Sequence, residues 1–142
     1  MNSVSLTMDL TRSLSMSQRI HQPHFVRFGR TAPSIPVTDI QRSIKFYSEV
    51  LGMKNVFENG TPIGFVILVK DDAEIHLTLA KSHVASDLNL VHLLVDDAKS
   101  LYDHLEKNKV KIVKGLRDAD YGLRQFVFAD PDGNRIDVGQ DI

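Results

Sequence analysis

The amino-acid sequence predicts an α+β fold in which two βαβββ modules form a curved mixed sheet with a concave cleft. The chain has 142 residues, a length that fits one domain. Short runs of β-branched, aromatic and other apolar residues, bounded by Asn, Asp, Gly and Pro, are typical of strands, and two apolar stripes have helical spacing. The same order of elements occurs twice along the chain, which indicates a duplicated unit.

The first module is expected at about residues 31–82. Its first strand, 34–38, contains Pro36, which favours an edge or terminal position because proline cannot donate to a strand ladder. Thr38 and Asp39 are both candidate caps for the helix that follows. Three more strands are expected at 54–58, 63–70 and 74–80. The apolar stripe of the helix consists of Ile40, Ile44, Tyr47 and Leu51, and Gly52 is placed to end it.

The second module, at about residues 88–142, repeats this order. Strand 90–95 is apolar on both faces except for His92, so we expect it to be buried on both sides. Strands at 110–113, 123–128 and 134–139 follow a helix, and a tight Asp130-Pro131-Asp132-Gly133 turn joins the last two. The stripe of this second helix consists of Ala98, Leu101, Tyr102 and Leu105.

Four strands with one covering helix leave the other face of the sheet open, so two units placed edge to edge are expected to enclose a cleft. Side chains alternate between the faces of a strand. Ile75, Leu77 and Leu79 should face the helix, and Glu74 and His76 should therefore face the cleft. The same alternation places Asp137 on the cleft side of the last strand.

The composition excludes several function classes. Lys and Arg number 17 against 18 Asp and Glu, a net charge of -1 that argues against binding to nucleic acid or to a membrane surface. The chain contains no cysteine, which excludes disulfides, thiolate metal sites and cysteine nucleophiles. No apolar run reaches the roughly 18 residues that would span a bilayer.

Residues 1–30 differ from the rest and are expected to form an N-terminal arm. They carry four arginines and one acid, Asp9, a balance of +3, which leaves 13 basic and 17 acidic groups, or -4, for residues 31–142. A disordered arm or an upstream start is favoured over an organellar targeting segment, although the Arg- and Ser-rich composition fits both. No secretory signal is expected, and the predicted location is the cytoplasm. Residues 25–28 are a candidate for a short extra strand.

Two motifs resemble the vicinal-oxygen-chelate superfamily, which comprises glyoxalases, bleomycin-resistance proteins and extradiol dioxygenases. The helix beginning Asp39-Ile40-Gln41-Arg42 and ending near Leu51-Gly52-Met53 resembles its first-helix signature, and Asp130-Pro131-Asp132-Gly133-Asn134 resembles its final hairpin. The match covers about residues 31–142. Three further stretches resemble the bleomycin-resistance proteins, which usually have Trp where Tyr121 stands: 32–36, 74–77 and 121–126.

This resemblance implies a non-catalytic homodimer that binds or sequesters a small organic, drug-like ligand in a cleft between subunits. Members of that group bind a bulky cationic drug there, and in some of them the first strand is exchanged between subunits. The candidate ligand-binding residues are Glu74, His76, His92, Tyr121, Arg124 and Asp137. Another hypothesis is that the protein is an interaction module whose cleft no longer binds a ligand.

Metal-dependent members of the superfamily hold their ion at positions that correspond here to Ala32, His76, Leu90 and Asp137. Ala32 and Leu90 cannot ligate a metal, and a catalytic divalent ion usually needs three protein ligands. We therefore expect no metal and no cofactor. The alternative is a divalent-metal-dependent lyase, isomerase or dioxygenase with rearranged ligands: His76, His92 and Asp137.

Overall fold

The computed structural model describes residues 25–142, which divide between a short segment, 25–31, and a compact unit, Ala32–Ile142. The extra strand predicted at residues 25–28 is wrong, because no neighbouring strand of the described chain pairs with this segment. The targeting and disorder hypotheses for residues 1–24 fall outside the described residues. Within the described part, no helix is long and apolar enough to cross a membrane.

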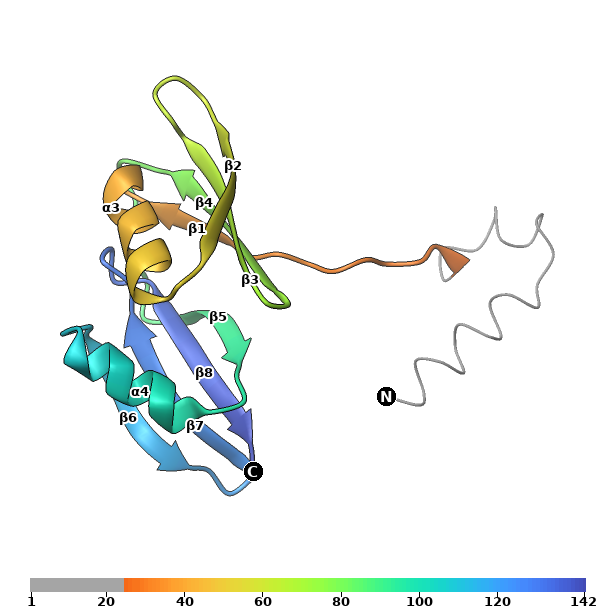
Figure 1. Ribbon diagram of the computed structural model, residues 1–142, viewed down its shortest axis with the longest axis vertical. Coiled ribbons are helices and arrows are strands. Elements are labelled where there is room, and N and C mark those ends of the chain that lie inside the picture. Colours follow the sequence, from red (N-terminus) through yellow and green to blue (C-terminus); the bar gives the residue numbers. More distant parts are fainter. Residues whose placement is uncertain (1–24) are drawn as a thin grey trace. The chain divides into compact units, whose positions relative to one another are not determined.

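The first module carries a four-stranded mixed sheet in the order β1-β4-β3-β2, with α3 and η2 on one face (Figure 1). Strand β1 runs parallel to β4, and the other neighbours are antiparallel. The elements are β1 (Ser34–Val37), α3 (Ile40–Lys45), η2 (Phe46–Val50), β2 (Lys54–Asn59), β3 (Phe65–Lys70) and β4 (Ala73–Leu79).

The second module repeats the topology with the sheet order β5-β8-β7-β6 and α4 on one face (Figure 1). Again the first strand of the module pairs in parallel with the last. The elements are β5 (Asn89–Leu94), α4 (Ala98–Lys107), β6 (Ile112–Asp118), β7 (Leu123–Ala129) and β8 (Arg135–Asp141). The predicted fold class of two βαβββ modules is therefore confirmed. Within the described residues the strands form two hydrogen-bonded sheets rather than one continuous sheet.

An aspartate caps the N-terminus of both α3 and α4. The Asp39 carboxylate accepts from the Arg42 amide at 3.1 Å, and the Asp97 carboxylate accepts from the Ser100 amide at 3.0 Å. The first helix differs from the regular α-helix that its stripe predicts. It widens into the π-helix η2, whose end is marked by a bond from the Leu51 amide to the Phe46 carbonyl at 3.3 Å.

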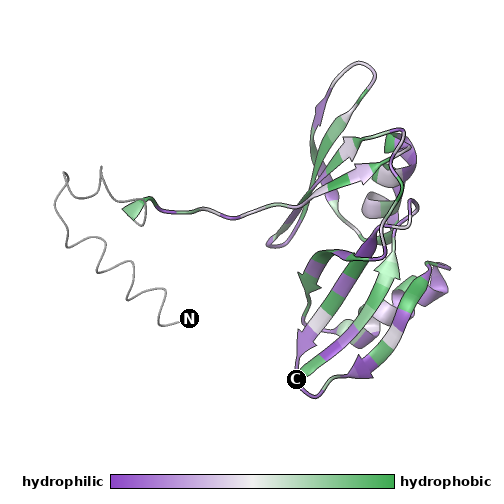
Figure 2. Ribbon diagram, turned by 180° about the vertical axis from the view of Figure 1, so that it is seen from behind, coloured by the Kyte–Doolittle hydropathy of each residue, from purple (hydrophilic) through white to green (hydrophobic). Residues whose placement is uncertain are grey.

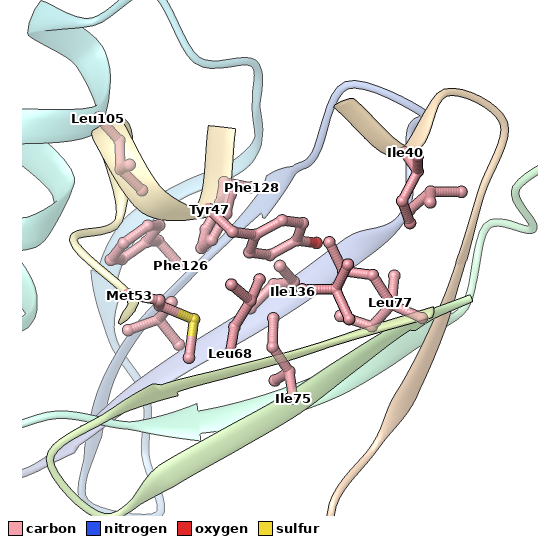
Figure 3. Packing of buried hydrophobic residues seen from close by; sticks show 14 of the residues in the cluster. Ile40, Tyr47, Met53, Leu68, Ile75, Leu77, Leu105, Phe126, Phe128 and Ile136 are labelled. Atoms are coloured by element: carbon pink, nitrogen blue, oxygen red, sulfur yellow. The ribbon is translucent and has the colours of Figure 1, made fainter. Parts of the chain in front are cut away.

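Several strands alternate between hydrophobic and hydrophilic residues, as the banding of the second sheet in Figure 2 shows. The buried faces of both sheets and the inner faces of the helices form one hydrophobic core. Figure 3 shows Tyr47 of the first module among Phe128 and Ile136 of the second. Tyr47 is 1% exposed and Phe128 0%, so the core joins the modules.

The expectation that strand 90–95 is buried on both sides is wrong. In β5, Leu90 is 44% exposed and Leu94 59%, while Val91 and Leu93 pack against the core. The helix covers only one face of the sheet. Nothing among the described residues covers Leu90 and Leu94 on the other face enough to bury them.

The predicted Asp130-Pro131-Asp132-Gly133 turn is present, and its flanking residues link the modules. Gly133 has φ +84°, in the left-handed region that glycine adopts without strain. The buried Tyr47 hydroxyl donates to Asp130 Oδ2 at 2.8 Å, and Asn134 Nδ2 donates to the Pro36 carbonyl at 2.9 Å. The hairpin therefore contributes partners for both the first strand and the first helix.

Candidate functional site

Glu74 and His76 form a hydrogen-bonded pair on the face of β4 that points away from α3. The distance from His76 Nε2 to Glu74 Oε2 is 2.7 Å. Ile75 and Leu77, between and beside them in the strand, are 7% and 0% exposed on the opposite face, as the alternation predicts. The side chains of Glu74 and His76 are 14% and 25% exposed, so both remain accessible at this surface.

An aromatic row lies beside this pair and was not among the predicted site residues. The rings of Phe65 and His76 meet edge to face at 5.3 Å between centroids, and Phe57 and Phe65 meet in the same way at 6.2 Å. Phe57 is 49% exposed. The sequence of β3 could have indicated this row. Phe65, Ile67 and Val69 make the face of β3 that points away from the helix apolar, and no helix covers that face.

His92 and Asp137 form a second pair on the corresponding face of the second sheet. His92 Nδ1 lies 2.7 Å from Asp137 Oδ2, and the two residues are register partners on the parallel strands β5 and β8. Gly139 allows the imidazole to lie close to β8, since a Cβ at this position would stand 3.3 Å from His92 Cε1. Within the described residues the second ring nitrogen of His76 and of His92 makes no hydrogen bond and can serve a ligand.

Tyr121 extends the second group through a residue that the predicted set omitted. Its hydroxyl donates to Gln125 Oε1 at 2.6 Å, and the Tyr121 side chain is 67% exposed. Gln125 pairs with Gly139 across β7 and β8 and shares the face of Asp137. Alternation with the buried Phe126 was the signal that could have placed Gln125 in the group.

The structure does not bring Arg124 together with this group. Arg124 pairs with Gln140, whose side chain accepts from the Ala98 amide at the start of α4, so both lie on the helix side of the sheet. Its guanidinium donates to both oxygens of Asp118, at 2.8 and 3.2 Å. These hydrogen bonds and the Asp118 charge raise the pKa of Arg124, and the Arg124 hydrogen bonds lower the pKa of Asp118.

The arrangement does not fit the donor set of a catalytic divalent ion. In the part of the chain that the structure describes, no three His, Asp or Glu side chains gather as metal ligands. His76 and His92 lie in different sheets, each bonded to its own carboxylate. Two acid–imidazole pairs with neighbouring aromatic rings can instead hydrogen-bond a polar organic molecule and stack on it.

Two cavities among the described residues lie elsewhere, along the segment that connects the modules. Their volumes are about 360 Å³ and about 120 Å³. None of the six predicted ligand-binding residues lines either of them.

The sequence model of the Glyoxalase/Bleomycin resistance protein/Dioxygenase superfamily matches residues 22–138. A bleomycin resistance protein of Geobacillus stearothermophilus is 28% identical over 132 residues, a match that covers 80% of this chain and 97% of the relative.

Many solved structures are similar to this chain, and two of them are bleomycin-related proteins. The bleomycin resistance determinant encoded on the transposon Tn5 has a TM-score of 0.69 at 22% identity, covering 80% of this chain and 98% of that one. The bleomycin-binding protein from Streptomyces verticillus, in complex with copper(II)-bleomycin, has a TM-score of 0.67 at 20% identity, covering 82% and 99%. At identities this low, the TM-scores show a shared fold and nothing more.

Proposed function

Because the chain belongs to the Glyoxalase/Bleomycin resistance protein/Dioxygenase superfamily, we propose that it binds and sequesters a small organic, drug-like ligand without transforming it. The bleomycin resistance relative at 28% identity favours this function within the superfamily. The observation that carries the proposal is the pair of groups on the uncovered sheet faces. One group is Glu74 and His76 with their aromatic row, and the other is His92, Asp137, Gln125 and Tyr121.

The ligand cleft is proposed to form between two copies of the chain. The first sheet of one copy would face the second sheet of the other, so that the two groups line one cleft. Exposed leucines on β5 support this arrangement, since apolar residues without cover indicate an interaction surface. Strand β1 pairs with β4 of its own chain, and the exchange of β1 between copies stays a prediction. The cytoplasmic location also stays a prediction.

Binding is tested by titrating the protein with bleomycin in a calorimeter. Tyr121→Ala should weaken binding about threefold to thirtyfold, because it removes an exposed ring that can stack on a planar or cationic group. Asp137→Asn should also weaken it. Asp71→Asn, in an exposed turn, removes the same charge outside the group and should leave affinity unchanged.

A thermal-shift screen of drug-like compounds, bleomycin included, is a second test of binding. A screen that yields no binder would contradict the proposal and favour an interaction module.

Dimer formation is tested by sedimentation of the wild type and of Leu94→Asp. The wild type should sediment as a dimer, and the variant as a monomer, because the new charge would be buried without a partner. Val84→Asp is the control and should stay dimeric, since Val84 is 86% exposed in the segment between the modules and belongs to neither sheet. A monomeric wild type would exclude the shared cleft.

The alternative is a divalent-metal-dependent lyase, isomerase or dioxygenase that uses His76, His92 and Asp137. The separation of the two histidines between the sheets disfavours it within one chain. Elemental analysis of freshly purified protein by inductively coupled plasma spectrometry separates the two functions. Stoichiometric zinc, nickel, manganese or iron that is lost in His76→Ala would support the enzyme and overturn sequestration.

A further inference from the structure

The larger cavity, of about 360 Å³, lies where the segment between the modules crosses one end of the second sheet. This volume falls within the range of roughly 300–1,000 Å³ that is usual for small-molecule sites. The residues relevant to its chemistry are Ser86, Asp87, Lys111, Val113, Asp132 and Arg135.

Backbone pairing on either side of β7 brings two cationic side chains to this cavity, one from the start of β8 and one from the residue just before β6. Arg135 is the register partner of Ala129, and the Ala129 amide donates to the Lys111 carbonyl at 2.9 Å. Lys111 and Arg135 are thus cross-strand neighbours of one residue. The backbones of strands two apart lie about 10 Å from each other, a span that two long side chains can close around a small group.

Neither cation is matched by a carboxylate among the described residues. Arg135 Nη1 donates to the main-chain carbonyl of Asp87 at 3.0 Å, which orients the guanidinium and leaves its other N–H groups available. Lys111 makes no ion pair in the described part of the chain. The two positive charges in the cavity wall therefore lack a protein counterion of their own.

The acidic residues in the wall do not cancel these charges fully. Asp132 accepts from the Thr38 amide and hydroxyl and pairs with Arg42 at 2.9 Å, so its charge is already balanced outside the cavity. Asp87 is exposed, and its carboxylate makes no hydrogen bond within the described residues. Ser86 accepts from the Leu88 amide at 3.2 Å, so its hydroxyl proton can be donated into the site.

We propose that this cavity is a binding site for a small oxyanion, a carboxylate or a phosphate group. The Arg135 fork binds two oxygens, Lys111 supplies a second charge, and Ser86 donates a hydroxyl hydrogen bond. The site shares none of the residues of the proposed organic-ligand cleft, so either function can fail without the other.

The test is calorimetric titration of the full chain with inorganic phosphate and, separately, with acetate. Saturable binding should weaken about tenfold in Arg135→Gln and in Lys111→Gln, since each removes a charge-assisted hydrogen bond. Lys54→Gln removes one positive charge from an exposed position in the first module and should bind as the wild type does. Tighter binding of one anion identifies the class of oxyanion.

Two further variants separate the site from general charge attraction. Val113→Phe fills the cavity, keeps every charge and should abolish binding, while Asp87→Asn removes a repelling charge and should strengthen it. Circular dichroism establishes that each variant is folded. Absence of binding to either anion, equal weakening in Lys54→Gln, or undiminished binding in Val113→Phe would overturn the proposal.

Discussion

The Tyr47 hydroxyl is a buried donor that joins the two modules. Burial raises the pKa of Tyr47, and the charge of Asp130 raises it further, so the phenol keeps its proton and donates to Asp130 Oδ2. Asn134 Nδ2 donates to the same carboxylate oxygen at 3.0 Å. Ser43, on the same helical segment, is also fully buried, but its Oγ has no hydrogen-bond partner among the described residues.

Tyr47→Phe should lower the free energy of unfolding by about 1–3 kcal/mol, because it leaves a buried carboxylate short of one donor. Ser43→Ala is the matched control. It removes a buried hydroxyl that forms no bond and should leave stability unchanged or raise it. The measurement is the urea midpoint of unfolding, compared between variants whose free energy of unfolding falls with urea at the same slope. Equal midpoint changes in the two variants would contradict this account.

At the scale of elements, the turn between β7 and β8 holds the first helix at its N-terminal end. Asp132 Oδ1 accepts from Arg42 Nη2 at 2.9 Å and from the Thr38 hydroxyl. Burial alone would raise the pKa of Asp132, but the Thr38 hydrogen bonds and the Arg42 charge outweigh it, and the pKa is lowered. Thr38 therefore binds the opposite module, and Asp39 caps the helix alone.

This lowered pKa makes the contact sensitive to acid. An unfolded chain takes up the Asp132 proton near the ordinary value of about 3.9, above the pKa of the folded protein. The stabilisation is therefore complete above that value and is lost as the pH falls through the folded pKa. Urea midpoints of the wild type and Asp132→Asn should differ at neutral pH and converge below about pH 4.

Asp103→Asn, which removes the carboxylate of an exposed pair with Lys99, is the control for this comparison. The urea midpoint of Asp103→Asn should stay close to that of the wild type across the whole pH range. A difference between the wild type and Asp132→Asn that persists unchanged in acid would contradict the role assigned to Asp132.

At the scale of the whole molecule, one core couples the two modules. The Phe128 ring lies 6.5 Å from Phe46 of the first module and 6.2 Å from Phe126 of the second, centroid to centroid. Phe126 in turn meets Tyr102 of α4 at 5.2 Å. Because neither module can withdraw without exposing these rings, the unit Ala32–Ile142 should unfold in one step.

Phe128→Ala should lower the free energy of unfolding by about 3–5 kcal/mol, since it leaves a cavity between the modules. The transition should stay single, with coincident midpoints by far-ultraviolet circular dichroism and tyrosine fluorescence. Separate midpoints for the two signals would show that the modules unfold independently.

The six candidate site residues illustrate what sequence patterns can place. Alternation within β4 correctly puts Glu74 and His76 opposite the buried Ile75 and Leu77. Alternation within β7 would have put Arg124 on the same face as Phe126, and it was the family resemblance that placed Arg124 in the predicted site. The apolar faces of β3 and β5 are ambiguous in sequence, because burial by a partner and exposure at a binding surface produce the same pattern.

By itself the sequence determined the order of the elements, Asp39 as one of two candidate caps for the first helix, and the helix-facing side of strands with clear alternation, such as β4. These features depend on residues within a few positions of one another, where periodicity and capping act. Only the tertiary structure decided that Asp130, Asp132 and Asn134 link the modules, that the two imidazole–carboxylate pairs lie in separate sheets, and that Lys111 and Arg135 share a cavity. Those contacts depend on how distant strands pair and how the two modules pack, and local periodicity carries no information about either.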